Sequence, residues 1–218
     1  MAETHDKPAT AGDARPGAVL LLGPTGSGKT PLGDALQACG LWGRACVHFD
    51  FGRVLRSCVR GDGAWGLPPD QCTLLARMLE TGALLEDEHF PVAERLFQAF
   101  LTQHRVGPAV RVVLNGLPRH VGQAAHMTPL VRMEAVVHLV CARETVLARL
   151  RRDAGGDRAA RKDDDLPRVR RRLALYRQRT EPLVAHYRAR EVRVVPLAVG
   201  PETTAEAMLG ELEARGPA

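Results

Sequence analysis

Eight residues near the N-terminus have the types and spacing of a phosphate-binding loop. They follow an apolar run and precede a segment of helical composition, and they fit the pattern GxxxxGK[ST]: Gly23-Pro24-Thr25-Gly26-Ser27-Gly28-Lys29-Thr30. Glycines let successive backbone N–H groups turn toward one anion, and the helix that follows adds the partial positive charge of its N-terminus. Lys29 is then placed to reach the β- and γ-phosphates of a nucleotide, and the Thr30 hydroxyl to bind Mg²⁺. The loop predicts nucleotide binding and leaves any second substrate open.

The overall charge is compatible with such a site. The net charge is +5, and only three of the 30 cationic residues are lysines, at positions 7, 29 and 162. A basic chain can bind nucleic acid or polyphosphate. Because no aromatic-interleaved basic patch or zinc-finger spacing occurs, the sequence favours the polyphosphate reading and predicts no nucleic-acid partner.

Composition also sets expectations for the environment of the protein. No apolar run approaches the length of a membrane span, and residues 1–17 lack the apolar segment of a signal peptide. We expect residues 1–17 to be a disordered tail. The five cysteines have no metal-binding spacing, which predicts buried, reduced thiols. These features together predict a cytoplasmic protein without a membrane partner.

Elements that could position the loop alternate along the chain. Five short apolar runs predict buried strands, at residues 18–22, 45–49, 110–114, 136–141 and 192–197. Helical patterns separate them, at residues 29–39, as a pair within 54–104, and at 144–152, 168–188 and 203–215. Alternating strands and helices favour a parallel sheet covered on both faces. We therefore predict one α/β domain over residues 18–218, a three-layer α/β/α fold with a five-stranded parallel sheet.

Two regions are expected to be additions to this domain. Residues 51–104 hold consecutive helices with no strand between them, which is typical of a helical insert. Residues 153–160 form a Gly/Ala/Asp-rich loop suited to a short lid. The acidic run 163–165 before Pro167 predicts an N-cap with proline in the first helical turn.

Several motifs after the loop resemble one enzyme family. They are, in chain order, Val54-Leu55-Arg56, Gly82-Ala83-Leu84-Leu85-Glu86-Asp87-Glu88, Asn115-Gly116-Leu117-Pro118-Arg119 with Gln123-Ala124, Arg161-Lys162-Asp163-Asp164, Val169-Arg170-Arg171-Arg172-Leu173 and Thr180-Glu181-Pro182-Leu183. In order and spacing they are similar to the motifs of adenylate kinases and related nucleoside-monophosphate kinases with a short lid, across residues 18 to 212. The resemblance implies a P-loop kinase fold in which the insert binds the monophosphate.

The resemblance also implies roles for individual cations. Arg56 and Arg119 are expected to hold the phosphate of the acceptor. Lys29, Arg119, Arg161 and Arg172 are expected to surround the phosphoryl group during transfer. By the same resemblance, a further arginine, in the helix before the lid, stacks on the adenine of ATP: Arg149.

The acceptor and the metal have implied positions too. Phe51, Leu85 and Gly116 line the expected base pocket, where Gln123 reads the edge of a purine. Mg²⁺ accompanies ATP and is expected on the Thr30 hydroxyl and, through water, on Asn115.

This set of residues suits phosphoryl transfer on physical grounds as well. Such a reaction needs two phosphates held in line, cations around the transferring group, and exclusion of water. Arginine forks bind phosphate oxygens in pairs. Because a phosphate acceptor is already anionic, we expect no general base.

Four positions depart from the family pattern. Phe51 replaces a small polar residue and Arg53 an acid, which could suit a different or more anionic acceptor. Asn115 stands where the family has an aspartate, so we expect weaker Mg²⁺ binding, and stronger Mg²⁺ dependence in Asn115→Asp. Asp153 occupies an expected basic position at the start of the lid.

The sequence therefore predicts a monomeric phosphotransferase that moves the γ-phosphoryl group of Mg·ATP to a nucleoside monophosphate, AMP or a related purine. Two alternatives stay open. One is a kinase for another small phosphorylated or phosphonate acceptor, favoured by Phe51 and Arg53. The other is a nucleotide-binding regulatory protein with weak turnover, favoured by Asn115 and Asp153.

Overall fold

The computed structural model describes residues 14–62, 65–152 and 166–217. Its centre is a sheet of five parallel strands in the order β2-β3-β1-β4-β5. The strands are β1 (Gly17–Leu22), β2 (Cys46–Asp50), β3 (Arg111–Asn115), β4 (Arg132–Val140) and β5 (Arg193–Ala198). The predicted five-stranded parallel α/β fold is confirmed. Gly17, predicted to be the last residue of the tail, is the first residue of β1. The start of β4 was predicted too late, at residue 136 instead of Arg132, because the first residues of this strand are partly exposed and include Arg132 and Glu134.

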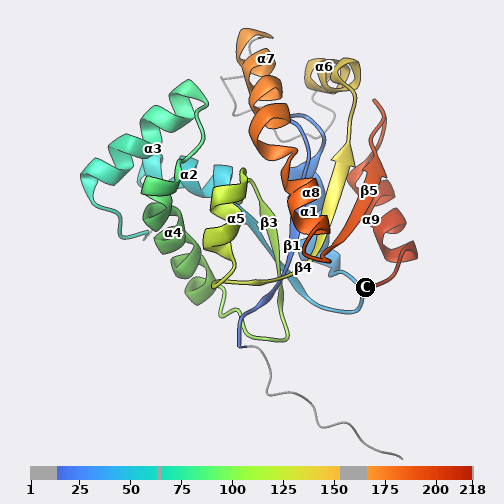
Figure 1. The fold of residues 1–218 in the computed structure, drawn as a ribbon, viewed down its shortest axis with the longest axis horizontal. Helices are drawn as coiled ribbons and strands as arrows, with labels where there is room; N and C mark the ends of the chain where they lie inside the picture. Colours follow the sequence, from blue (N-terminus) through green and yellow to red (C-terminus); the bar gives the residue numbers. More distant parts are fainter. Residues whose placement is uncertain (1–13, 63–64, 153–165, 218) are drawn as a thin grey trace, which may run out of the picture.

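Alternating side chains divide β1 between two apolar cores, one on each face of the sheet. Ala18, Leu20 and Leu22 belong to the first core and Val19 and Leu21 to the second. The first core is completed by α4 (Phe90–Gln103), α5 (Val121–Met127) and α8 (Leu183–Arg188). The second is completed by α1 (Lys29–Cys39) and α9 (Ala205–Ala214). Helices on both faces make the predicted three-layer arrangement (Figure 1).

The predicted pair of helices within residues 54–104 is wrong. The structure has α2 (Phe51–Arg60), α3 (Pro69–Thr81), a short 3-10 turn η1 (Asp87–His89) and α4. Gly61 and Gly82 end α2 and α3 in the left-handed conformation, with φ of 74° and 69°. Glycine adopts this conformation without a steric cost, so each marks a helix end that the apolar pattern alone conceals. Figure 1 shows α2, α3 and α4 together at one end of the molecule.

The predicted single helix over residues 168–188 is also divided. The structure has α7 (Leu166–Leu175), a π-helical turn η2 (Tyr176–Thr180) and α8, and α6 (Arg143–Arg152) precedes them. Pro182 lies between η2 and α8, and a proline inside a helix removes one backbone hydrogen bond and clashes with the preceding turn. The predicted lid, its Asp153, the acidic cap and Arg161 lie outside the described residues.

All five cysteines fall within the described residues and none forms a disulfide. Cys46 and Cys58 are buried as predicted, but Cys39 is exposed and Cys72 and Cys141 are half-buried. Of the described helices, none has the length and apolarity needed to cross a membrane.

An ion-pair network at the amino ends of the strands gives one stability prediction. Glu134 accepts hydrogen bonds from Arg111 at 2.7 Å and Arg44 at 2.9 Å. Burial raises the pKa of Glu134, but the hydrogen bond and charge of Arg111, with those of Arg44, outweigh burial and lower it below the ordinary 4.5. The ionised carboxylate therefore stabilises the fold above its unfolded pKa, and this stabilisation is lost as pH falls through the lower folded pKa.

We expect Glu134→Gln to reduce the free energy of unfolding by about 1.5–3 kcal/mol at neutral pH, the range for hydrogen bonds to charged groups. Urea unfolding at about pH 7 and about pH 3 measures this, because the difference from the unmodified protein should shrink in acid. An equal difference at both pH values would contradict a role for the Glu134 charge.

Candidate active site

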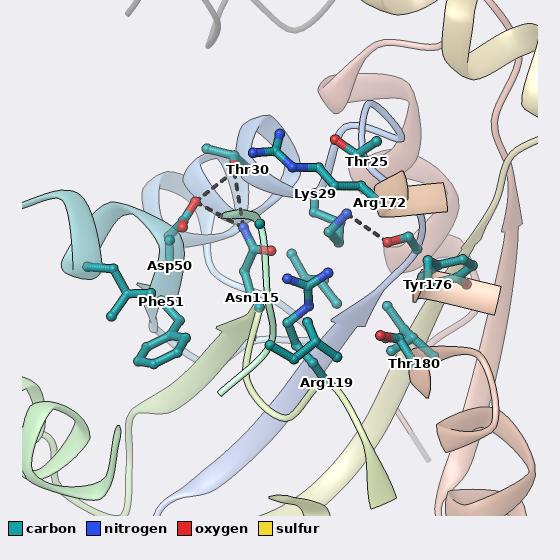
Figure 2. Close-up of a pocket in the computed structure, with 18 of the residues that line it drawn as sticks. Thr25, Lys29, Thr30, Asp50, Phe51, Asn115, Arg119, Arg172, Tyr176 and Thr180 are labelled. Carbon is teal, nitrogen blue, oxygen red and sulfur yellow. Dashed lines mark hydrogen bonds between the residues drawn. The ribbon is translucent and has the colours of Figure 1, made fainter. Parts of the chain in front are cut away.

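A cavity of about 220 Å³ lies at the carboxyl ends of β1, β2 and β3. In a parallel sheet this edge is where ligands bind. Most of the predicted site residues line this one cavity: Gly23, Thr25, Gly26, Gly28, Lys29, Thr30, Phe51, Arg56, Leu85, Asn115, Gly116, Arg119, Gln123, Arg149 and Arg172. The two other predicted loop residues lie elsewhere, Pro24 in a neighbouring hollow and Ser27 fully buried beneath the loop. Figure 2 shows Lys29, Arg119 and Arg172 around the same space, although they come from distant parts of the sequence.

The phosphate-binding loop has the predicted conformation. Gly26 and Gly28 have φ of 78° and 93°, which an L side chain rarely adopts, and α1 begins at Lys29. The Lys29 ammonium donates to the carbonyls of Gly23 and Pro24 at 2.8 and 2.7 Å. To hold a phosphate, the ammonium must exchange these carbonyls for phosphate oxygens, which are the stronger acceptors.

A buried polar cluster joins the loop to the ends of β2 and β3. Thr30 donates its hydroxyl hydrogen to Asp50 at 2.7 Å, and the Asn115 amide donates to the same Asp50 oxygen at 3.0 Å (Figure 2). The Asn115 amide nitrogen also lies 3.1 Å from the Thr30 oxygen. Sequence reasoning missed Asp50. The available signal was its position, since an acid directly after a strand of a parallel sheet lies at the ligand-binding edge.

Two guanidinium groups give the cavity its charge. Burial, and secondly the positive charge of Arg172, lower the pKa of Arg119 to about 10. Arg119 remains cationic at neutral pH, because even this lowered pKa lies far above 7. Across the described residues the Arg119 guanidinium has no carboxylate partner. Two half-buried cations that line one cavity attract an anion such as phosphate.

Two further contacts connect the helical insert with the rest of the site. Arg172 on α7 reaches the end of α3, where a Cβ placed on Gly82 would lie 3.7 Å from the Arg172 Nε. Arg179 on η2 makes a bidentate pair with Glu86, at 2.8 and 3.2 Å. These contacts bring the insert and the α7–η2 segment to one cavity.

The two unusual residues at the start of α2 are both engaged within the protein. The Phe51 ring packs against Phe49 with centroids 6.0 Å apart, and Phe51 is 5% exposed, so it contributes to the core as well as to the cavity wall. Arg53 forms a bidentate pair with Asp34 on α1, at 2.9 and 3.1 Å. Arg53 does not line the cavity, so the structure gives no support to its expected contact with an anionic acceptor.

Gln123 and Arg149 line the cavity but also hold backbone groups. Gln123 accepts from the Arg119 N–H at 2.7 Å and donates to the Leu85 carbonyl at 2.7 Å. Arg149 is 3% exposed and donates to the carbonyls of Gly26, Gly200 and Thr203, at 3.1, 2.9 and 2.8 Å. The predicted contacts of Gln123 with a purine edge and of Arg149 with adenine stay predictions.

Comparison with known proteins finds relatives that align over most of the chain. No family model matches the chain. It is 33% identical over 181 residues to an adenylate kinase of Thermus thermophilus, covering 80% of this chain and 85% of that protein. It is 31% identical over 199 residues to an adenylate kinase of Thermobifida fusca, covering 87% and 95%. A solved structure of a gluconokinase from Sinorhizobium meliloti 1021 superposes with a TM-score of 0.48 at 18% identity, over 93% of this chain and 94% of that one. On the strength of the adenylate kinase relatives, this chain belongs to the adenylate kinase family and is a P-loop kinase.

Proposed function

We propose that the protein transfers the γ-phosphoryl group of Mg·ATP to a nucleoside monophosphate, with AMP or a related purine monophosphate as the acceptor. One observation carries the proposal: Lys29 from the loop, Arg119 from the β3–α5 turn and Arg172 from α7 all line one cavity. The relatives named adenylate kinase support the same acceptor class.

Each cation has a distinct part in this reaction. Lys29 leaves the loop carbonyls and binds the β- and γ-phosphates. Arg119 and Arg172 bind oxygens of the transferring group and of the acceptor phosphate, so that negative charge shared between them is neutralised in the transition state. Arg56 supports the acceptor phosphate from α2.

The residues present also fit a magnesium ion that arrives with ATP. Mg²⁺ binds mainly to phosphates, water and one or two protein oxygens. Among the described residues no group of three or more His, Cys, Asp and Glu side chains could hold a metal alone. The buried Thr30 hydroxyl and its Asp50 partner are oxygens of the right chemistry at the loop. Bound there, Mg²⁺ neutralises phosphate charge.

The acceptor site lies between the insert and the β3–α5 turn. Leu85, Gly116 and Gln123 line this part of the cavity. Although Gln123 already makes two hydrogen bonds, a side-chain amide has two N–H groups and two acceptor sites, so one of each remains for the edge of a base. In this proposal α2, α3 and α4 form the acceptor-binding insert.

A second candidate acceptor is another small phosphorylated compound. The engagement of Gln123 with Leu85 and Arg119 favours it, because an amide held at both ends is less adaptable to a purine. The phosphate-binding arginines serve either acceptor equally.

A panel of acceptors tests the proposal. ADP formation from Mg·ATP is measured with AMP, dAMP, GMP, CMP, UMP and no acceptor. We expect the highest rate with AMP or another purine monophosphate and almost none without acceptor, since ATP hydrolysis needs water in a site built to exclude it. Silence across the panel with ATP binding intact would overturn the nucleoside-monophosphate assignment in favour of another acceptor or of a regulatory role.

A further inference from the structure

The family resemblance leaves one gap in the site. At the end of β3, where the family pattern has an aspartate, this chain has the neutral Asn115. The neighbouring strand β2 ends in Asp50, and the sheet register pairs Asp50 directly with Asn115. A carboxylate is therefore present at the same edge, displaced by one strand.

The displaced carboxylate lies against the loop hydroxyl. Asp50 Oδ2 accepts the Thr30 hydroxyl hydrogen at 2.7 Å, and both residues are buried, at 6% and 9% exposure. The hydrogen of Thr30 points to Asp50, and the hydroxyl oxygen accepts one hydrogen bond from the Asn115 amide at 3.1 Å. One lone pair of the oxygen is therefore left to bind a cation. Asp50 thus fixes the orientation in which Thr30 acts as a metal ligand.

Asn115 is oriented to complement this carboxylate. Its amide nitrogen faces Asp50 at 3.0 Å and lies 3.4 Å from His48 Nε2. His48 Nδ1 lies 2.9 Å from Asp34, and in the tautomer that donates this hydrogen to Asp34, Nε2 is the acceptor. Every group facing the Asn115 nitrogen therefore accepts a hydrogen bond, and an aspartate at 115 would place a second carboxylate beside Asp50.

The position of the His48 ring beside Asn115 depends on a glycine in α1. A Cβ on Gly33 of α1 would lie 2.3 Å from His48 Nε2, so only glycine at that position leaves room for the ring. The ring in turn places Nε2 as an acceptor 3.4 Å from the amide nitrogen of Asn115.

We propose that Asp50 is the metal-positioning carboxylate of this enzyme, replacing the one absent at Asn115. This inference rests on the proposed use of Mg·ATP. In it, Asp50 orients Thr30 and accepts hydrogen bonds from the water molecules around Mg²⁺. Asn115 is a positioning residue that holds Asp50 in place.

Asp50 also has a structural task, which the test must preserve. Its other oxygen, Oδ1, accepts from the Arg53 N–H at 2.9 Å and caps α2. Asparagine and serine are good N-cap residues, so Asp50→Asn and Asp50→Ser remove the charge and retain the cap.

The experiment measures ATP binding by calorimetry with and without Mg²⁺, together with Mn²⁺ binding to the ATP complex by electron paramagnetic resonance. We expect both Asp50 variants to weaken Mn²⁺ binding by about 10- to 100-fold, as for other groups that position metal ligands, and to leave metal-free ATP affinity unchanged or higher. The exposed Asp62→Asn is the control and should match the unmodified protein.

An exchange of the two side chains makes the test sharper. The sequence alone predicts stronger Mg²⁺ dependence in Asn115→Asp, but the position of Asp50 reverses this expectation. With Asp50 present, Asn115→Asp should not tighten Mn²⁺ binding, because two adjacent carboxylates repel. The double variant Asp50→Asn/Asn115→Asp should recover most of the binding lost in Asp50→Asn. Unchanged Mn²⁺ binding in both Asp50 variants, or an equal loss of ATP affinity with and without metal, would overturn the proposal. These readouts need no acceptor, so they stay informative even where the acceptor panel fails.

Discussion

Lys29→Ala is expected to lower acceptor-dependent ADP formation by at least about 100-fold, the size of effect seen when one preorganised charge-stabilising donor is removed. Lys29 is the only cation of the loop, and its ammonium lies 2.7–2.8 Å from the carbonyls of Gly23 and Pro24, at the loop itself. Its loss removes the charge that meets the γ-phosphate and leaves the backbone N–H groups in place. Initial rates at saturating ATP measure the effect.

The exposed Arg170→Ala is the matched control, since it also removes one cation from the protein but does so away from the cavity. Its rate should equal that of the unmodified protein. A Lys29→Ala protein that is folded and still turns over at the control rate would show that the loop does not hold the reacting nucleotide.

Arg119→Ala is expected to reduce turnover by about 100- to 1,000-fold while leaving ATP affinity nearly unchanged, because in the proposed reaction its guanidinium faces the transferring group and the acceptor. The pKa of Arg119 is lowered to about 10 by burial and by Arg172, so keeping this side chain charged in the folded protein reduces the free energy of unfolding. The variant should therefore be as stable as the unmodified protein, or more stable. Steady-state kinetics with varied acceptor and a thermal melt measure the two effects.

Arg119→Lys separates charge from geometry. Lysine keeps the charge but cannot bind two oxygens with one planar group, so we expect only partial recovery of turnover. Loss of stability together with equal loss of ATP affinity in Arg119→Ala would mean that Arg119 supports the fold instead of the reaction.

The sequence predicted the elements whose signals are local. The loop and α1 follow from one motif, with α1 at the predicted residues 29–39, and the buried strands follow from short apolar runs. Helix ends set by a single glycine or proline were missed because an amphipathic pattern continues across them. The division near Pro182 is an example.

The parts of the site that the sequence did not predict depend on contacts between segments that are distant in the chain. Asp50 has the local signature of a helix N-cap, and its contact with Thr30 exists because α1 packs against β2. Arg53 on α2 likewise pairs with Asp34 on α1, 19 residues away in the sequence, which no local pattern encodes. Residue type and spacing predicted cations that the structure brings to one cavity, whereas the contacts of Asp50 and Arg53 required the fold.

The most direct test of the central claim follows the γ-phosphoryl group itself. The protein is incubated with ATP labelled at the γ-phosphate and with the acceptor that gives the highest rate, and the products are separated. We predict label in the β-phosphate of the new nucleoside diphosphate, with almost none in free phosphate. In Lys29→Ala the label in the diphosphate should be lost. Label released only as free phosphate at the same rate with and without acceptor would contradict phosphoryl transfer between two bound nucleotides.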